Sequence, residues 1–288
     1  GVLAAVGAGD LAGVGPFPDY MAAMRPVRTF ALAADRVRYV GAPVAAIVAE
    51  DRWRAEDALE AVRAEYESLA AVTTLEQALA GDAPRLYEDW PDNKAVDLVR
   101  ADSEVERILA ASRVVRGSYR MHRQAPSPLE TRGSVAAYAA GRLTLWTATQ
   151  TPHIVRTLLA GMLGLPEHSV RVIVDEVGGS FGGKTHVYPE DVLVAWLAIR
   201  LGRPVRWIED RAEHFLTSVQ ARDQRHELEA AIDDDGHILA LRARITCDIG
   251  SGETFPAGIA SSFVTGGVLT GPYRIPHAEV AIRCVVTN

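Results

Sequence analysis

Apolar and polar positions in the first 80 residues predict a small unit of strands with one helix. Two β-rich runs, residues 36–40 and 44–48, are separated by a Gly-Ala-Pro turn, so they are expected to pair as a hairpin. Asp51 precedes a segment with apolar residues at helical spacing and is expected to cap a helix. The apolar face expected for this helix comprises Ala55, Ala58, Leu59, Val62 and Tyr66.

Strand and helix patterns alternate again in the second half of the chain. Residues 143–149 alternate as a strand that ends at Gln150. Thr151, followed by a proline, has the pattern of a helix N-cap, and Gly164 is expected to end that helix. An apolar run over residues 170–177 predicts the next strand. A βαβ crossover of this kind would make the two strands parallel, so that both end at one edge of a sheet.

The remaining pattern completes a layered fold. Residues 190–201 are apolar on nearly every side, which predicts a buried helix. Asp235 and Gly236 have the composition of a tight turn and are expected to join strands over residues 227–232 and 238–247. We therefore predict an α/β (α+β) fold with two units. Residues 81–94, with two prolines and mixed charge, are predicted to link residues 1–80 to residues 95–288.

Composition narrows the function classes. The 288 residues are 48% hydrophobic and 23% charged, as in ordinary globular proteins. A net charge of −7 gives no support for a nucleic-acid partner, and no apolar run reaches the length of a membrane span. Two cysteines cannot supply the four thiolates of an iron–sulfur cluster, so both are expected to be reduced core residues. A start without methionine or a basic segment, and a strand-like end, suggest a fragment.

A glycine-rich segment over residues 178–185 carries the candidate chemistry. Four glycines in six residues leave backbone N–H groups free to approach an anionic or oxo-bearing ligand. Gly178, Gly183, Lys184 and Thr185 match G-x-x-x-x-G-K-[ST], the pattern of nucleotide-binding loops. Pro189 counts against that interpretation, since it falls where the phosphate-binding helix should continue. A P-loop hydrolase remains one alternative, and a non-catalytic domain that packs against partner subunits is another.

Five segments carry a second interpretation: 178–184 (GGSFGGK), 127–133 (SPLETRG), 145–152 (LWTATQTP), 202–205 (GRPV) and 210–213 (DRAE). In consistent order they resemble the GGxFGGK loop and the P-[LM]-E, strand-glutamine, G-R-P-V and R-x-E pieces of the molybdenum hydroxylases. That family comprises xanthine dehydrogenase, aldehyde oxidase and aerobic carbon monoxide dehydrogenase. The resemblance implies an α/β hammerhead domain over residues 1–80, and the N-terminal part of a molybdenum-cofactor-binding domain over residues 95–288.

The resemblance also assigns candidate site residues. Gln150 is expected to donate a hydrogen bond to an oxo ligand of molybdenum, and Gly179, Phe181 and Gly182 to bring bare backbone against the cofactor. Thr185 is expected in the substrate pocket, where the purine-hydroxylating branch has a glutamate, so purine is a poor substrate candidate. No residue is expected to bind the metal directly. The cofactor implied is molybdenum–molybdopterin, in its cytosine dinucleotide form if the source is bacterial.

The reaction implied is hydroxylation of an aldehyde, an N-heteroaromatic or a carbon monoxide-like substrate, with water as the oxygen source. Electrons would pass to iron–sulfur and FAD subunits, in a cytoplasmic dimer of heterotrimers. The glutamate that acts as general base, and the loop that defines the branch, are expected beyond residue 288. We therefore expect no catalytic residue within this chain, and no turnover by the chain alone.

Other polar residues are expected to have structural roles. Glu130 is expected to pair with Arg132, and Lys184 to neutralise cofactor phosphate or support the loop. The acidic run over residues 233–235 has the composition of a solvated turn. Four histidines lack the spacing of metal ligands: His122, His153, His168 and His186.

Overall fold

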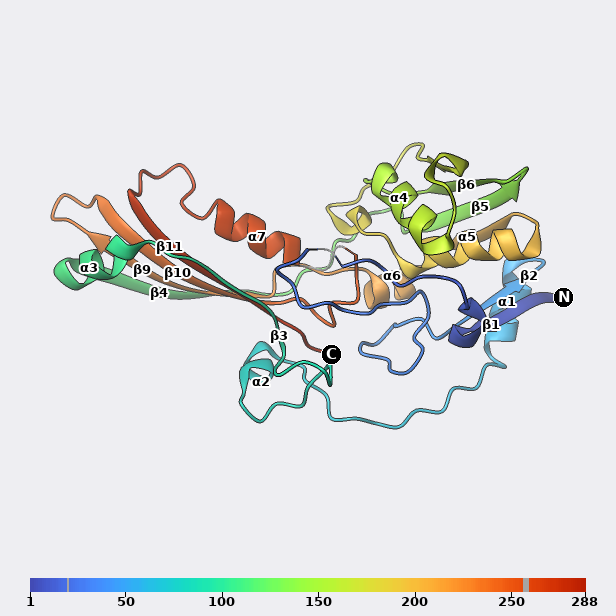
Figure 1. Ribbon diagram of the computed structural model, residues 1–288, viewed down its shortest axis with the longest axis horizontal. Helices are drawn as coiled ribbons and strands as arrows, with labels where there is room; N and C mark the ends of the chain where they lie inside the picture. Colours follow the sequence, from blue (N-terminus) through green and yellow to red (C-terminus); the bar gives the residue numbers. More distant parts are fainter. Residues whose placement is uncertain (20, 256–258) are drawn as a thin grey trace.

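The computed structural model describes residues 1–19, 21–255 and 259–288, without the side chains of residues 259–261. The described residues form three sheets, with two, five and four strands. Figure 1 shows an elongated molecule with the five-stranded sheet at one end and the four-stranded sheet at the other. No helix in the described ranges combines the length and the apolar character needed to cross a membrane.

The four-stranded sheet has the order β7-β6-β5-β8. Its strands are β5 (Gly133–Ala139), β6 (Arg142–Thr147), β7 (Val170–Ile173) and β8 (Val205–Ile208). β6 and β7 are parallel, which confirms the crossover expected from the sequence. β7 is shorter than the predicted strand, because its pairing with β6 ends at Trp146 and Ile173.

Two helices cover this sheet and follow the sequence prediction closely. α4 (Pro152–Leu163) begins after Thr151 and ends at Gly164, which adopts a left-handed conformation with φ of 64°. α5 (Pro189–Leu201) is buried along most of its length and packs on β5, β6 and β8. Their apolar side chains form the main core together with those of β5 and β6. This core holds the ends of β6 and β7 in place.

The five-stranded sheet has the order β3-β11-β10-β9-β4. Its strands are β3 (Lys94–Arg100), β4 (Arg113–Met121), β9 (Gln224–Ile232), β10 (Ile238–Asp248) and β11 (His277–Val285). The antiparallel pairing of β9 with β10 confirms the predicted hairpin. α7 (Ile259–Gly267) packs on one face, while α2 (Leu75–Leu79) and α3 (Ser103–Ala111) pack on the other. Cys247 and Cys284 are free, buried and directly opposite each other on β10 and β11.

The hairpin predicted at the N-terminus is wrong. β2 (Ala45–Ala49) pairs with β1 (Val2–Gly7), and residues 36–40 form no strand. That segment is instead held by side-chain contacts. The Arg38 guanidinium pairs with Glu253 at 2.9 Å and lies over the Tyr87 ring, 4.7 Å from its centroid. These distant contacts override the β propensity of the run.

The helix after Asp51 forms, but its predicted apolar face is not buried. α1 (Arg52–Leu59) has Asp51 as its N-cap, which accepts a hydrogen bond from the Arg54 N–H. The helix ends before Val62, and none of its residues is buried. Leu59 and Tyr66 are largely exposed. Apolar residues at helical spacing therefore continue past the end of α1, at Val62 and Tyr66.

The predicted linker is not the most exposed part of the chain between α1 and β3. Residues 63–71 are exposed and without regular structure, and they run along the outside of the molecule from α1 toward α2 (Figure 1). The expected linker over residues 81–94 is instead packed, because the side chains of Leu86, Tyr87 and Trp90 are buried against the five-stranded sheet. Phe17 and Leu32 also join the main core, so residues 1–80 do not close a core of their own.

Limited proteolysis should therefore cut first within residues 63–71. This segment offers Arg63 to trypsin and Glu65 and Glu67 to a glutamate-specific protease, in exposed backbone. N-terminal sequencing of the early fragments would locate the cut. Cleavage within residues 81–94 before residues 63–71 would contradict this expectation.

Candidate functional site

The glycine segment forms a turn between β7 and α5 that is exposed at its tip, Phe181 and Gly182. It passes through a short 3-10 helix over Gly183–Thr185. Gly179, Phe181 and Gly182 have positive φ angles of 95°, 52° and 91°. Phe181 is unusual among them, because a residue with a side chain rarely adopts this conformation. Its side chain is 80% exposed.

The backbone at Gly182 faces open space. A Cβ atom built on Gly182 would have no heavy atom of the described chain within 4 Å. The positive φ there nevertheless strains any residue other than glycine. The tip of the loop thus presents backbone outward, with room for a ligand to approach.

Gln150 lies directly against this loop. Its backbone N–H donates to the Lys184 carbonyl at 2.9 Å. Its side-chain oxygen Oε1 accepts a hydrogen bond from Ser180 Oγ and another from Thr185 Oγ1, the latter at 2.9 Å. The structure therefore brings Gln150 together with Thr185 and with Ser180 and Lys184, which flank the Phe181–Gly182 backbone; their role in cofactor binding stays a prediction. Ser180 was missed, since a serine within a glycine loop gives no separate sequence signal.

The hydroxyl contacts fix the orientation of the Gln150 amide. Ser180 Oγ accepts a hydrogen bond from the Lys184 N–H at 2.9 Å, so its own proton is free to be donated to Gln150 Oε1. With Oε1 occupied twice, the amide group Nε2 remains as a donor. No hydrogen bond from Nε2 is present among the described residues, and Gln150 is exposed. The site therefore offers an oriented N–H donor beside bare backbone.

A second segment, residues 126–130, forms the floor beneath the loop. A Cβ atom on Gly183 would lie 2.8 Å from Pro126 Cγ, and one on Gly178 would lie 2.6 Å from Glu130 Cβ. A Cβ atom on Gly179 would lie 3.2 Å from Pro128 Cβ. Close packing against the floor therefore excludes a side chain at Gly178 and Gly183 without a shift of the floor and leaves little room at Gly179, whereas Gly182 has open space.

The expected Glu130–Arg132 pair is wrong, because Glu130 pairs with Lys184. Lys184 Nζ lies 2.5 Å from Glu130 Oε2, and the same oxygen accepts from the Gly178 N–H at 2.8 Å. Burial by itself would raise the pKa of Glu130, but these hydrogen bonds and the lysine charge hold the pKa below its usual value. Lys184 is almost fully buried, so it supports the loop from within.

Arg132 instead centres a buried charge network beside the site. Its guanidinium contacts Glu209 at 2.5 Å and Glu190 at 3.0 Å, and it lies over the Tyr188 ring, 3.7 Å from the centroid. Burial by itself would raise the pKa of Glu209, but the Arg132 charge and hydrogen bonds hold the pKa below its usual value. Burial raises the pKa of Tyr188 to about 12. Arg132 ties β5 to α5 and to the residue after β8.

The nucleotide-binding interpretation of the loop is wrong. Lys184 Nζ points to Glu130 beneath the loop and is 1% exposed, so it cannot reach a phosphate lying on the loop. The following helix, α5, begins only at Pro189 rather than at the G-K-T triplet. A P-loop requires the lysine to contact phosphate and the helix to begin at this triplet.

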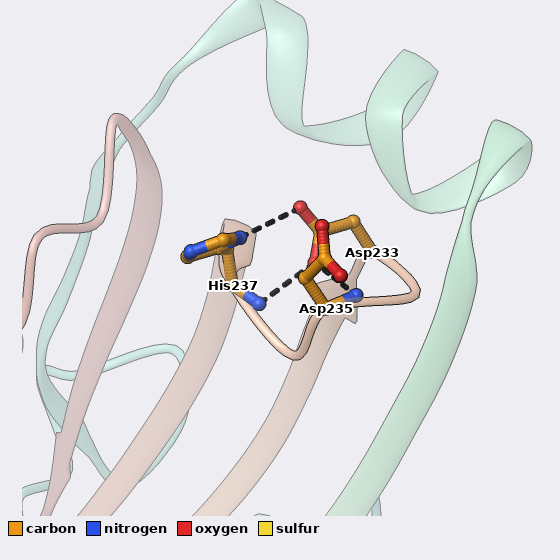
Figure 2. A group of neighbouring side chains, drawn as sticks. All are labelled: Asp233, Asp235 and His237. Carbon is orange, nitrogen blue, oxygen red and sulfur yellow. Dashed lines mark hydrogen bonds and ion pairs between the residues drawn. The ribbon is translucent and has the colours of Figure 1, made fainter.

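One cluster of possible metal ligands lies far along the chain, at the β9–β10 turn. Figure 2 shows that the Asp233 carboxylate is occupied within the turn itself. It accepts from the N–H groups of Asp235 and His237, at 3.0 and 2.8 Å, and contacts His237 Nδ1 at 3.0 Å. His237 and Asp235 are exposed. These contacts explain the acidic run as the solvated turn expected from composition.

The layered α/β fold, with an outward-facing glycine loop beside an oriented amide, is an arrangement suited to holding a cofactor. The chain belongs to the molybdopterin cofactor-binding domain family, whose model matches residues 86–288. The aldehyde oxidase and xanthine dehydrogenase a/b hammerhead domain matches residues 1–70. The predicted order, a hammerhead domain followed by a cofactor-binding domain, is thereby confirmed. The boundaries at residues 80 and 95 remain predictions.

Individual relatives agree with this family. The 6-hydroxypseudooxynicotine dehydrogenase complex subunit gamma of Paenarthrobacter nicotinovorans is 39% identical over 261 residues, 89% of this chain and 32% of that protein. The carbon monoxide dehydrogenase large chain of Hydrogenophaga pseudoflava is 36% identical over 279 residues, 89% of this chain and 34% of that one. The crystal structure of quinoline 2-oxidoreductase from Pseudomonas putida 86 has a TM-score of 0.93 and 39% identity, covering all of this chain and 37% of its own. The chain thus spans about a third of the length of these relatives.

Proposed function

We propose that this chain is the molybdopterin-binding part of an oxidoreductase that hydroxylates an aldehyde, an N-heteroaromatic or a carbon monoxide-like substrate, using water. Support comes from family membership and from relatives whose names specify dehydrogenation of 6-hydroxypseudooxynicotine and of carbon monoxide. When bound, the molybdenum cofactor would supply the redox chemistry of this reaction. The observation that carries the proposal is the Gln150 amide, held with its donor outward beside the exposed loop backbone.

The residues present fit such a cofactor. Gln150 Nε2 would donate a hydrogen bond to an oxo ligand without adding charge. Gly179, Phe181 and Gly182 would bring bare backbone against the cofactor, and the open space at Gly182 supports this placement. Thr185 would lie toward the substrate while holding Gln150 through its hydroxyl. None of these residues is proposed to bind the metal directly.

The partners proposed are an iron–sulfur subunit and an FAD subunit, which would accept the electrons in a cytoplasmic dimer of heterotrimers. The cytosine dinucleotide form of molybdopterin is proposed with them. Support comes from relatives described as the gamma subunit of a complex and as a large chain, names that imply further chains in those proteins. Co-purification of two further chains that carry iron and FAD would test this assembly.

Replacing Gln150 with alanine is expected to lower turnover in the protein isolated from its host while leaving it folded. A lost hydrogen bond to a charged or oxo centre costs about 1.5–3 kcal/mol, so kcat/KM should fall roughly 10- to 150-fold. Gln150→Glu is the matched variant, because it can still accept from Ser180 and Thr185 but offers no donor at neutral pH. Wild-type kcat/KM in Gln150→Glu would contradict the donor role.

Gly182→Val should abolish loading of molybdenum, whereas Gly141→Val should not. Both glycines have positive φ and open space around a built Cβ, at 91° and 75° respectively, so the backbone strain is matched. Only the Gly182 side chain would occupy the space proposed for the cofactor. Metal analysis of the two purified variants would compare molybdenum per chain. Full molybdenum content in Gly182→Val would remove the loop from the cofactor site.

A further inference from the structure

The floor of the glycine loop, residues 126–130, is itself held by a short helix. This helix, α6 (Arg211–Thr217), is fixed at its start by a capping box, in which Asp210 and Glu213 each accept from the other's backbone N–H at 2.8 Å. The helix contacts backbone carbonyls of the floor, whereas the loop glycines pack mainly on the side chains of Pro126, Pro128 and Glu130.

Two side chains of α6 bind the backbone of the floor. Arg211 donates from one guanidinium nitrogen to the carbonyls of Pro128 and Leu129, at 2.8 and 3.0 Å. His214 Nε2 lies 2.9 Å from the Pro126 carbonyl. Pro126 and Pro128 pack against the loop glycines. Leu129 lies between Pro128 and Glu130, which also packs against them. A shift of the floor would therefore move the loop.

His214 bridges Glu209 and the floor through its two ring nitrogens. Nε2 lies 2.9 Å from the Pro126 carbonyl, and Nδ1 lies 2.8 Å from the Glu209 carboxylate. Ser218 Oγ also lies 2.8 Å from Nδ1. The side chains of His214 and Glu209 are 2% and 0% exposed, and Arg132 contacts the other oxygen of the same carboxylate. His214 is thus a buried side chain that joins the Arg132 network to the floor.

We propose that Arg211 and His214 are positioning residues for the cofactor-binding loop, acting through the floor rather than by contact with cofactor. The two residues fix three backbone carbonyls, and the floor fixes Gly178, Gly179 and Gly183 by close packing and Lys184 by an ion pair. This inference rests on the proposed function only in naming molybdopterin as the ligand of the loop. The mechanical link itself does not depend on that ligand.

Hydrogen exchange in the protein isolated from its host tests the link directly. His214→Gln and Arg211→Gln should speed amide exchange in residues 178–185 by about tenfold or more, equivalent to about 1.4 kcal/mol of local opening. Exchange in α5 should not change, because its core contacts are untouched. Arg211→Lys should restore most of the protection, since an ammonium group can still donate to the two carbonyls. Arg211 is only half-buried, so its variants remain informative even if His214→Gln does not fold.

Leu216→Ala is the control, because this side chain is exposed on the same helix and contributes no hydrogen bond to the floor. Faster exchange confined to residues 178–185 in the two glutamine variants, with rescue by lysine, supports the proposal. Unchanged exchange in the loop, or equal changes in the loop and α5, overturns it.

Molybdenum content of the same samples separates this proposal from the proposed function. A wild-type protein without molybdopterin, combined with faster loop exchange in the variants, would reject the cofactor and keep the positioning role. If the wild type contained molybdopterin but loop exchange did not change in the variants, the cofactor would be kept and the positioning role rejected. Loss of molybdenum from Arg211→Gln, with recovery in Arg211→Lys, would support both.

Discussion

Arg132→Met should destabilise this chain by about 3–5 kcal/mol, the usual cost of removing one partner from a buried charge network. The substitution leaves Glu209 with a fully buried carboxylate and without its guanidinium partner. It also removes the cation that lies between the Tyr188 and Trp207 rings, at 3.7 and 5.3 Å from their centroids. Urea unfolding followed by tryptophan fluorescence would measure the change, with Trp207 as a nearby reporter.

The loss should depend on pH with a defined sign. In the wild type the pKa of Glu209 is lowered. The contribution of Glu209 to the free energy of unfolding is therefore complete above the ordinary glutamate pKa, and it is lost as the pH falls through the lowered value. Without Arg132, burial would raise this pKa, and the penalty of the charged form would be greatest near neutrality. The difference between wild type and variant should therefore shrink from about pH 7 to about pH 4.

Arg107→Met is the matched control for this experiment. Arg107 forms a surface pair with Glu104 on α3, and its side chain is 70% exposed. A surface pair of this kind is worth little, so the change should stay within about 0.5 kcal/mol at each pH. Equal effects of the two substitutions would show that the buried network does not stabilise the chain.

The second large effect is an asymmetry between the two partners of the pair under the glycine loop. Glu130→Ala should cost about 3 kcal/mol, because it leaves the Lys184 ammonium buried without a charged partner. Lys184→Met should cost about 1 kcal/mol or less, since methionine fills the same space and Glu130 retains contact with water. The side-chain exposures are 1% for Lys184 and 42% for Glu130, which is the source of the asymmetry.

A double variant checks the interpretation. Glu130→Ala combined with Lys184→Met should be more stable than Glu130→Ala alone, because the stranded charge is removed. Denaturant unfolding of the three variants and the wild type completes the cycle. If Lys184→Met cost more than Glu130→Ala, desolvation of the lysine would not be the controlling effect.

Local patterns predicted the elements that depend on local signals. α4, α5 and the β9–β10 hairpin follow from a cap and proline, an all-round apolar run and an Asp-Gly turn. The approach of Gln150 to the loop followed from two parallel strands that end at one edge. These predictions required no knowledge of distant partners.

Failures occurred where a distant partner decided the outcome. Residues 44–48 could have paired with any nearby β-rich run, but β2 pairs with β1, some 40 residues upstream. Glu130 could not be matched to Lys184, 54 residues away, because a closer arginine satisfied the same charge rule. Arg132 meets Glu190 and Glu209, 58 and 77 residues further along. Sequence spacing does not encode such contacts.

The contact between Val72 and Asn288 has a consequence for synthesis of the protein. The Asn288 N–H donates to the Val72 carbonyl and the Val72 N–H to the Asn288 side chain, both at 2.7 Å, across 216 residues. Val72 also packs on Val285 in a small apolar cluster. At roughly 5–20 residues per second, a ribosome needs on the order of ten to forty seconds to supply those later residues. During that interval the apolar surface around Val72 is uncovered, which is the state that chaperones recognise and that favours aggregation during rapid overproduction.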